Sequence, residues 1–434
     1  MDCGDIFKNK RITVLGLGLL GRGVGDVEFL AKCGAQVLVT DKKSETELAE
    51  SVAKLKQYKN VTFKLGGHDI QDFKNCDMVI KAAGVSLDSP EIAATREAGI
   101  PIAMSTALFA KYAMKAGAKV VGITGTRGKT TVAHMIAHVL KQVEREVHLG
   151  GNIRGVSTLA MLPAVGKDSI AVLELDSWQL QGFGDLKISP NISVFTNLMP
   201  DHQDYYKNMD EYFSDKANIF RYQHVSDVLI AGSTIADRVR VAQPPLDPII
   251  PEKIPSAWTL KVIGEHNREN ASLANAALQA LGLSDDEIKT GLELFEGVEG
   301  RLQFVREVNG VKIYNDNNAT TPEATIAALH ALGEERKIVL IMGGADKELD
   351  MSVLIEEIGK RCKAVYLLAG TGTQRIQKYL PAPVLGSLEK AFGSALAAAV
   401  PGDVILFSPA FASFGMFKNE YERNDQFLTI VNRS

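Results

Sequence analysis

A glycine-rich segment with the sequence GITGTRGKTT, residues 122–131, combines residue types that bind phosphate. It lies between an apolar run and a segment with helical periodicity, so Gly125 and Gly128 can turn backbone N–H groups toward phosphate oxygens at a helix N-terminus. Lys129 is expected to reach the terminal phosphates of a nucleotide, and the Thr130 hydroxyl to bind magnesium. The segment therefore predicts a site for a nucleoside triphosphate.

The spacing within this segment departs from the commonest phosphate loop. That pattern has a glycine five positions before Gly128, where this chain has Ile123. The alternative interpretation is a simple strand-to-helix turn, which needs one glycine but has no use for a Gly-Lys-Thr triplet. We therefore retain the prediction of a nucleotide site, with a spacing of its own.

Two acidic residues end the predicted strand at 170–176. Glu174 and Asp176 are two positions apart, which places both carboxylates on one face of a strand. Carboxylate oxygens are ligands that magnesium prefers, so the pair is suited to hold a metal in front of the phosphate loop. For Asp176 alone, a solvated strand end is an equally good interpretation.

Asp201 and His202 follow the end of another predicted strand, at 192–198. Ligands of open parallel sheets gather outside the carboxyl ends of the strands. A lone histidine is more often structural than catalytic, but His202 stands at a strand end comparable to that of Glu174. We therefore treat His202 as a candidate site residue.

A histidine pair follows the phosphate loop. His134 and His138 have the i, i+4 spacing of a helical zinc site, but Met135 stands where that pattern has its general-base glutamate. We expect both histidines to be packing residues.

A second glycine loop lies near the N-terminus. Gly16, Gly18 and Gly21 form GxGxxG directly after an apolar run, and Asp41 ends the next predicted strand. This is the fingerprint of a dinucleotide site with a ribose-binding acid, and alone it would indicate a nicotinamide-dependent oxidoreductase. Beside a second nucleotide loop, it favours a nucleotide-linked substrate.

The elements that must position these residues alternate along the chain, with short runs rich in Val and Ile between segments of helical period. This alternation predicts an α/β fold of parallel sheets with crossover helices. We expect three domains: a Rossmann-like domain at 1–104, a central P-loop ATPase-type parallel sheet at 105–299 and a Rossmann-like domain at 300–434. The predicted strands are 11–18, 35–41, 77–84, 119–125, 170–176, 192–198, 227–232, 311–316, 337–344, 364–370 and 403–409.

Composition limits the classes of partner. The 434 residues carry a net charge of -4, so no basic excess is available to neutralise nucleic-acid phosphates. The cysteines at 3, 33, 76 and 362 form no CxxC pair, which favours a reduced chain over a disulfide framework or a zinc site. The N-terminus lacks the apolar core of a signal peptide, and no apolar run reaches the roughly 18 residues that span a bilayer. We expect a cytoplasmic monomer with no nucleic-acid or membrane partner.

Together these motifs resemble those of the Mur ligase family, whose phosphate loop reads GTxGK(S/T), as GTRGKT does here. The resemblance covers essentially the whole chain and is greatest to the D-glutamate-adding members. Their GGxDK, NDSKATN and SPAxASFDxFKN segments are similar to GGADK, NDNNATT and SPAFASFGMFKN in this chain. GEHNREN is similar to the asparagine-containing segment of the family, and EGRLQ is similar to the segment that carries its arginine.

The resemblance implies a set of site residues, together with ATP, two magnesium ions and a lysine at 216 that is carbamylated by carbon dioxide. The implied catalytic residues are Lys129, Glu174, His202, Lys216 and Arg301. The implied ATP contacts are Gly125, Thr126, Arg127, Gly128, Lys129, Thr130, Thr131, Asn267, Asn270, Arg301 and Asp316. The implied magnesium ligands are Thr130, Glu174, His202 and Lys216. The implied substrate contacts are Gly16, Gly18, Leu19, Leu20, Gly21, Asp41, Lys42, Gly84 and Asn152 for the carrier, and Thr320, Lys347 and Ser413 for the amino acid.

The implied activity is ATP-dependent addition of D-glutamate to UDP-N-acetylmuramoyl-L-alanine through an acyl phosphate, a cytoplasmic step of peptidoglycan precursor synthesis. The chain departs from the family pattern at Leu20, at Ala82–Val85, at Asn318 and at Glu420. A related ligase with another carrier or amino acid, of the pseudomurein or folylpolyglutamate type, therefore remains an alternative. The alternative from another class is the nicotinamide-dependent oxidoreductase.

Overall fold

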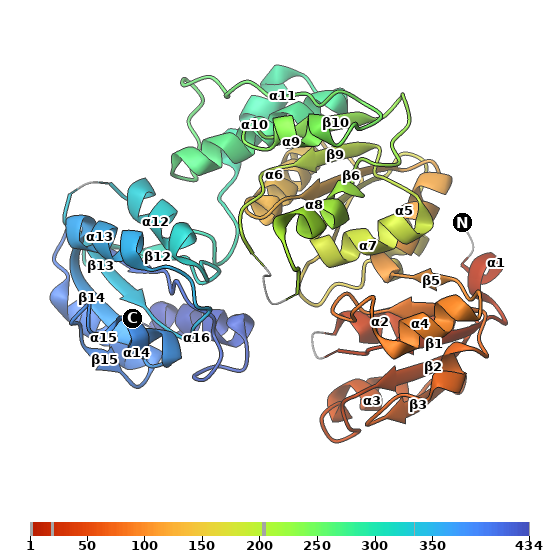
Figure 1. The fold of residues 1–434 in the computed structure, drawn as a ribbon. Helices are drawn as coiled ribbons and strands as arrows, with labels where there is room; N and C mark the ends of the chain where they lie inside the picture. Colours follow the sequence, from red (N-terminus) through yellow and green to blue (C-terminus); the bar gives the residue numbers. More distant parts are fainter. Residues whose placement is uncertain (1–2, 19–20, 202–204, 334, 434) are drawn as a thin grey trace. The chain divides into compact units, whose positions relative to one another are not determined.

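The computed structural model describes residues 3–18, 21–201, 205–333 and 335–433. These residues form three β-sheets with helices packed against them, which confirms the predicted α/β class (Figure 1). The chain divides into two compact units: the first contains Met1–Lys253 and Asn270–Gly291, and the second contains Ile254–Glu269 and Leu292–Ser434. The first two sheets share the first unit, and the third sheet lies in the second unit.

The first sheet is parallel, with the strand order β3-β2-β1-β4-β5. The order reverses at β1 and β4, and ligands of such sheets bind outside the carboxyl ends of the strands at this point. Gly21 caps α2 with a φ of 82°, in the left-handed region that favours glycine. The elements are α1 (Gly4–Phe7), β1 (Arg11–Leu15), α2 (Arg22–Lys32), β2 (Gln36–Asp41), α3 (Ala49–Leu55), β3 (Val61–Leu65), η1 (Ile70–Phe73), β4 (Met78–Lys81), α4 (Pro90–Glu97) and β5 (Ile102–Ala103).

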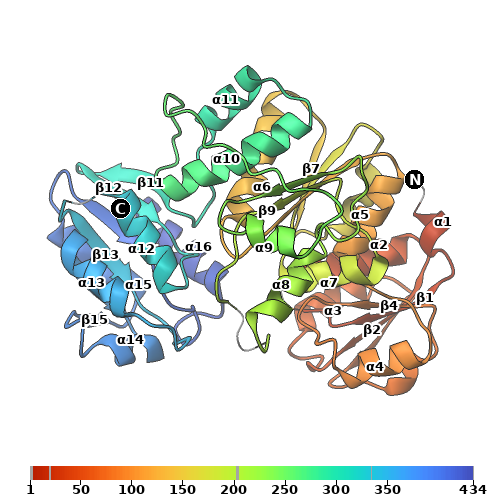
Figure 2. The same ribbon diagram turned by 45° about the horizontal axis from the view of Figure 1, so that its top comes forward.

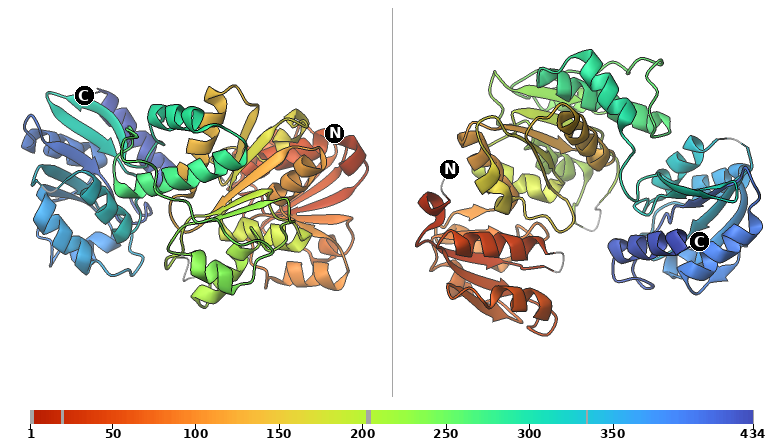
Figure 3. Two further views of the ribbon diagram at one scale, coloured as in Figure 1. Left: turned by 90° about the horizontal axis from the view of Figure 1, so that it is seen from above. Right: turned by 180° about the vertical axis from the view of Figure 1, so that it is seen from behind.

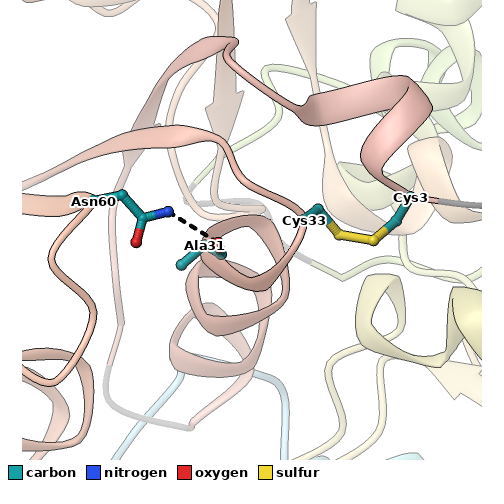
Figure 4. The surroundings of a disulfide bond; sticks show 4 residues. All are labelled: Cys3, Ala31, Cys33 and Asn60. Carbon is teal, nitrogen blue, oxygen red and sulfur yellow. Dashed lines mark hydrogen bonds between the residues drawn. A yellow bond between two sulfur atoms is a disulfide. The ribbon is translucent and has the colours of Figure 1, made fainter.

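A disulfide joins Cys3, just before α1, to Cys33 at the end of α2 (Figure 4). The expectation of a fully reduced chain is therefore wrong for this pair. The two cysteines are 30 positions apart in sequence, but their Cα atoms are 5.4 Å apart because α1 lies against the end of α2. Cys76 and Cys362 are buried free thiols, as expected.

The second sheet is also parallel, with the order β10-β9-β6-β8-β7. Its central strand β6 leads into the phosphate loop, and α10 and α11 lie beside α6, the helix that follows the loop (Figure 2). Strand β7 was not predicted, because its residues VHLGG form no apolar run. The elements are α5 (Ser105–Lys115), β6 (Lys119–Thr124), α6 (Lys129–Gln142), β7 (Val147–Gly151), η2 (Leu159–Ala164), β8 (Ile170–Glu174), α7 (Ser177–Leu186), β9 (Ile192–Phe195), α8 (Met209–Ala217), β10 (Val228–Ala231), α9 (Ala236–Val241), α10 (Glu265–Ala280) and α11 (Asp285–Leu294).

The third sheet is mixed, with the order β11-β12-β16-β13-β14-β15, and only β11 is antiparallel to its neighbour. Asn309 and Gly310 both have positive φ, the signature of the two-residue turn that joins β11 to β12. Helices cover both faces of this sheet (Figure 3). The elements are β11 (Gln303–Val308), β12 (Val311–Asn315), α12 (Pro322–Ala331), β13 (Ile338–Met342), α13 (Ser352–Arg361), β14 (Cys362–Leu368), α14 (Thr371–Ile376), β15 (Val384–Leu385), α15 (Leu388–Ala398), β16 (Val404–Phe407) and α16 (Glu420–Arg433).

The core follows from the alternation of side chains along the strands. Leu340 of β13 packs with α12 and α13 on one face of the third sheet, and Ile341 packs with α15 and α16 on the other. One continuous core joins the first two sheets within the first unit. Across the described residues, no helix is both long enough and apolar enough to cross a membrane.

Candidate active site

The phosphate loop joins the end of β6 to the start of α6. Gly125 and Gly128 have φ values of 138° and 84°, which favour glycine. A side chain at Gly125 would collide with the Thr196 hydroxyl, and one at Gly128 would collide with the amide oxygen of Asn270. Both glycines are therefore required by conformation and by space, as the sequence predicted for a cradle of backbone amides.

The loop is held by the segment after β9, in which Asp201 was noted from the sequence but Asn197 was not. Thr126 N donates to Asn197 O at 3.0 Å, and Arg127 N donates to Asn197 Oδ1 at 2.9 Å. The Arg127 guanidinium also pairs with Asp201 at 3.3 Å. The side chain of Lys129 lies over the loop, where Nζ donates to Gly125 O at 2.9 Å and to Thr126 O at 3.0 Å. Thr130 and Thr131 follow in the first turn of α6.

Lys216 extends from α8 to the same loop. Its side chain is 1% exposed, and Nζ donates to Gly125 O at 3.0 Å and to Thr124 Oγ1 at 3.4 Å. The ammonium also lies 4.6 Å from the centre of the Tyr212 ring. Burial and the nearby charge of Lys129 lower the pKa of Lys216 well below its ordinary value. This environment favours the neutral, nucleophilic amine.

The two carboxylates after β8 have different roles. Glu174 is 3% exposed and pairs in register with Ile123 of β6 and Gly151 of β7, so it lies at the end of the sheet where the phosphate loop leaves β6. Asp176 instead caps α7, where Oδ1 accepts from Gln179 N at 2.7 Å. The solvated strand end proposed for Asp176 is thus replaced by a helix cap, a role that a short side chain with an acceptor oxygen fulfils.

The metal set predicted from the sequence is only partly visible. His202 lies outside the described residues. In the part of the chain that the structure describes, no three His, Cys, Asp or Glu side chains gather in one place. The predicted set does not require such a cluster, because Thr130 contributes a hydroxyl and a carbamylated Lys216 would add oxygens that an unmodified lysine lacks.

The first glycine loop borders a pocket of about 230 Å³ in the first unit. Gly16, Gly18 and Gly84, which are predicted to contact the carrier, line it. Asp41 stabilises the loop through hydrogen bonds, since its Oδ2 accepts from Leu17 N at 2.8 Å and from Gly18 N at 3.4 Å. Leu19 and Leu20 lie outside the described residues, and Lys42 is exposed.

Polar groups from both sheets of the first unit surround this pocket. Arg22 Nη1 donates to Oδ1 of the predicted residue Asn152 at 2.9 Å, and Asp26 Oδ1 accepts from Ser157 Oγ at 2.6 Å. Burial raises the pKa of Asp26 to about 6.

The sequence analysis missed Lys81, which also lines the pocket although its side chain is only 2% exposed. Burial lowers the pKa of Lys81 to about 8. The only sequence signal was a lysine at the end of an apolar strand.

The predicted ATP residues of the second unit are largely buried. Arg301 Nε is buried and has no hydrogen-bond partner among the described residues. Asp316 Oδ1 accepts from Leu302 N at 2.9 Å, and Oδ2 accepts from the Ser408 hydroxyl at 2.8 Å. A ribose hydroxyl would therefore have to share an Asp316 oxygen that is already bonded. Asn267, also in the second unit, is buried on α10, and its Nδ2 donates to Ile263 O at 2.8 Å. Asn270, on the same helix, is buried too but belongs to the first unit.

The three residues predicted to hold the amino acid lie on adjoining loops of the second unit. Lys347 Nζ donates to Thr320 Oγ1 at 3.2 Å. Ser413 follows Ala412, which exchanges backbone hydrogen bonds of 2.9 and 3.2 Å with Ala345. These loops therefore bring an ammonium and two hydroxyls into one region, a set of donors suited to a carboxylate.

Comparison with known proteins decides the family. Sequence profiles match residues 10–104 (Mur ligase MurD-like, N-terminal domain), 123–243 (Mur ligase middle domain) and 300–411 (Mur ligase, glutamate ligase domain). A curated relative from Roseiflexus sp. (strain RS-1), named UDP-N-acetylmuramoylalanine--D-glutamate ligase, is 35% identical over 97% of this chain and 98% of its own length. The chain belongs to the Mur ligase family. A relative of the same name from Borreliella burgdorferi (strain ZS7) is also 35% identical, over 99% of both chains.

Solved structures give this Mur ligase the same fold. The UDP-N-acetylmuramate-alanine ligase MurC from Thermotoga maritima has a TM-score of 0.63 at 20% identity and covers 98% of this chain and 100% of its own. The MurF ligase from Thermotoga maritima, solved in complex with ADP, has a TM-score of 0.60 at 15% identity, with 99% and 97% covered. Membership of this family favours the ligase over the oxidoreductase for the two glycine loops.

Proposed function

We propose that this Mur ligase joins D-glutamate to the carboxylate of UDP-N-acetylmuramoyl-L-alanine and converts ATP to ADP and phosphate. The observation that carries the proposal is the full-length likeness to curated relatives of that name, at 33–35% identity for those from Roseiflexus, Borreliella and Acetivibrio thermocellus. We also propose that it acts in the cytoplasm, as a monomer. Light scattering of the purified protein checks the oligomeric state.

The phosphate loop is suited to the first chemical step. The carrier carboxylate attacks the γ-phosphorus of ATP, the bond to ADP breaks, and an acyl phosphate forms. Two anions must approach each other in this step. Positive charge that stabilises the transition state more than the bound substrates therefore accelerates it. Lys129 at the start of α6, together with the loop amides between Gly125 and Gly128, would supply it.

The second step needs an amine nucleophile and a leaving phosphate. The D-glutamate amine attacks the acyl carbon, and the tetrahedral intermediate collapses to an amide with loss of phosphate and a proton. Lys347, Thr320 and Ser413 would hold the carboxylates of glutamate, because an ammonium and hydroxyls donate strong hydrogen bonds to carboxylates.

The reaction of ATP is expected to use two magnesium ions, as the family resemblance implies. Thr130, Glu174, His202 and carbamylated Lys216 would hold them, and bound magnesium would neutralise phosphate charge. The neutral Lys216 amine attacks carbon dioxide and loses a proton, which turns a cation into an oxygen ligand. Burial against Gly125 and the lowered pKa of Lys216 support this modification.

The pocket at the first glycine loop would bind the nucleotide-linked carrier. Its backbone glycines allow close approach of a diphosphate, and Arg22 and Lys81 bring positive charge to its lining. Asn152, bonded to Arg22, would face the muramoyl end.

Phosphate release with each carrier and amino acid in turn tests the proposal. We expect turnover that requires ATP, magnesium, UDP-N-acetylmuramoyl-L-alanine and D-glutamate together. Lys129→Ala should lower kcat by about 100-fold or more without unfolding the protein, on the scale of a lost charge-stabilising group. The exposed Lys141, at the far end of the same helix, is the matched control as Lys141→Ala.

Other outcomes would assign the protein elsewhere. Turnover with a different amino acid or an unlinked carrier would move it to another branch of the family. Thermal protection by NAD, with none by ATP and magnesium, would favour the oxidoreductase.

A further inference from the structure

A buried polar network connects the carrier pocket to the helix that bears Lys216. Lys81 ends β4 and lines the pocket, and its Nζ donates to Gln181 Oε1 on α7 at 3.3 Å. Gln181 Nε2 in turn donates to Asp215 Oδ2 on α8 at 2.8 Å. Asp215 immediately precedes Lys216, so this path of hydrogen bonds leads from the pocket to the phosphate loop.

The pocket side of the network is anchored to a substrate loop. Lys81 Nζ also donates to Val85 O at 3.2 Å, which holds the loop that follows β4. Gly84 of this loop lines the pocket, and a Cβ on Gly16 would lie 3.1 Å from Ala82 Cβ. One ammonium therefore contacts both the loop that would receive the carrier and the helix α7.

The helix side is anchored to α8. Asp215 Oδ2 also accepts from the Tyr206 hydroxyl at 2.9 Å, and Gln181 Nε2 donates to the Tyr205 hydroxyl at 3.2 Å. These bonds fix the turn of α8 on which Lys216 points to Gly125 O. A shift of α7 against α8 would break them and displace Lys216.

The chemical identity of each residue matches this arrangement. A buried polar group without a partner is costly, so a lysine at a 2% exposed position is retained only when its donors are satisfied. A carboxamide accepts on one side and donates on the other, which is what Gln181 needs between an ammonium and a carboxylate. An apolar side chain at either position would lose these hydrogen bonds and the connection that they make.

We propose that Lys81 and Gln181 are positioning residues that tie the carrier-binding loop Ala82–Val85 to the placement of Lys216 through Asp215. Only the expected effect on kinetics rests on the proposed function. The coupling between the loop after β4 and α8 does not depend on which substrate the protein uses.

Hydrogen exchange of the full chain tests the structural part. In Lys81→Met, amides of residues 82–89 and of α8 should exchange about 10-fold faster than in the parent, on the scale of one lost buried hydrogen bond. The amides of α6 serve as internal reference. Lys64→Met removes a lysine from β3 of the same sheet, at a 47% exposed side chain, and should leave α8 unchanged. Parent-like exchange in α8 of Lys81→Met would overturn the proposal.

A charge rearrangement keeps the test valid if Lys81→Met folds poorly. Gln181→Glu keeps an oxygen that accepts from Lys81, but it places a second carboxylate beside Asp215. The two negative charges repel each other, so the amides of α8 should exchange faster. Adding Asp215→Asn restores a donor to face the new carboxylate, and exchange should return toward the parent value. If the double variant exchanges as fast as Gln181→Glu, the bridge is not the connection.

Kinetics separate a positioning role from a merely structural one. Lys81→Met should raise KM for the carrier and lower kcat by about 10-fold each, while KM for ATP stays within about 2-fold. Unchanged kcat in a variant with altered exchange would overturn the link to catalysis. If the parent enzyme gives no turnover with the carrier, the proposed function fails, and the exchange measurements still decide the coupling.

Discussion

At the scale of single residues, the site depends on charges held out of water. Lys216 is the clearest case, because burial and the neighbouring Lys129 both disfavour its ammonium. A buried amine that stays neutral reacts with carbon dioxide, whereas an exposed lysine is protonated. The same principle applies to Asp316, a carboxyl enclosed in the second unit.

Lys216→Ala is expected to lower kcat by about 100-fold or more, because the oxygens of the proposed carbamate would be lost from the phosphate site. Added formate or acetate should restore part of the rate, since a free carboxylate can occupy the space of the carbamate. Steady-state phosphate release measures both effects. A fully active variant, or a parent protein whose intact mass shows no added carbon dioxide in bicarbonate at alkaline pH, would count against the carbamate.

Asp316→Asn is expected to flatten the pH dependence of stability. Burial raises the pKa of Asp316 to about 7, from 3.8 as its ordinary value. The folded chain thus holds this proton more tightly than the unfolded chain does, so the stabilisation is complete below about pH 4 and is lost as the pH rises through about 7. Asparagine stays neutral throughout, and the difference at pH 8 should be on the order of 2–4 kcal/mol.

Urea unfolding of both proteins at pH 5 and pH 8 measures this difference. Glu389→Gln, on the exposed start of α15, is the control and should follow the parent. Parallel pH profiles for Asp316→Asn and the parent would refute the assignment.

At the scale of elements, α1 is held to α2 by a ring contact and by a disulfide. Phe7 packs edge-on against Phe29 of α2 at 5.9 Å between ring centres, and the disulfide joins Cys3 to Cys33. A cross-link that closes a loop of about 30 residues restricts the unfolded chain and contributes about 3–4 kcal/mol. Cytosolic reductants keep most thiols reduced, so this stabilisation should depend on redox conditions.

Cys3→Ser should therefore unfold at a lower temperature than the oxidised parent, by about 2–6 °C. Reductant should lower the Tm of the parent to that of the variant and leave the variant unchanged. Thermal unfolding followed by circular dichroism, with and without dithiothreitol, makes the comparison. A parent Tm that is insensitive to reductant would mean that the bond adds no stability.

At the scale of the whole molecule, different units would bind different substrates. The phosphate loop and the carrier pocket belong to the first unit, and the donors predicted for the amino acid belong to the second. A change confined to the second unit's loops should therefore alter the use of one substrate selectively.

Lys347→Ala is expected to raise KM for D-glutamate by about 10-fold or more, the scale of one charge-assisted hydrogen bond, with KM for ATP nearly unchanged. Steady-state kinetics with D-glutamate varied at saturating ATP and carrier measures this. Lys390→Ala, an exposed lysine of α15 in the same unit, is the control. An unaltered KM for D-glutamate would reduce Lys347 to a solvated turn residue, and a preference for another amino acid would change the substrate assignment.

Much of this molecule was predictable because its signals are local. The phosphate loop, the first glycine fingerprint and the alternation of strands and helices are properties of residues that are neighbours in sequence, where conformation depends on local sterics and periodicity. The elements that were missed, such as β7, have sequences whose strand character comes from their neighbours in the sheet.

Contacts between distant segments could not be obtained in this way. Lys81 meets Gln181 across 100 positions, and Lys216 meets Gly125 across 91. A lysine at a strand end has many partners of equivalent chemistry along the chain, and each cysteine has three. Local sequence does not rank them, because the choice depends on which segments the sheets bring together and on how completely each polar group is removed from water. The phosphate loop could thus be predicted from the sequence alone, because its residue types lie in ten consecutive positions. The buried contacts of Lys216 and Lys81 and the pairing of Cys3 with Cys33 are known only from the folded structure, because these join segments that are distant in sequence.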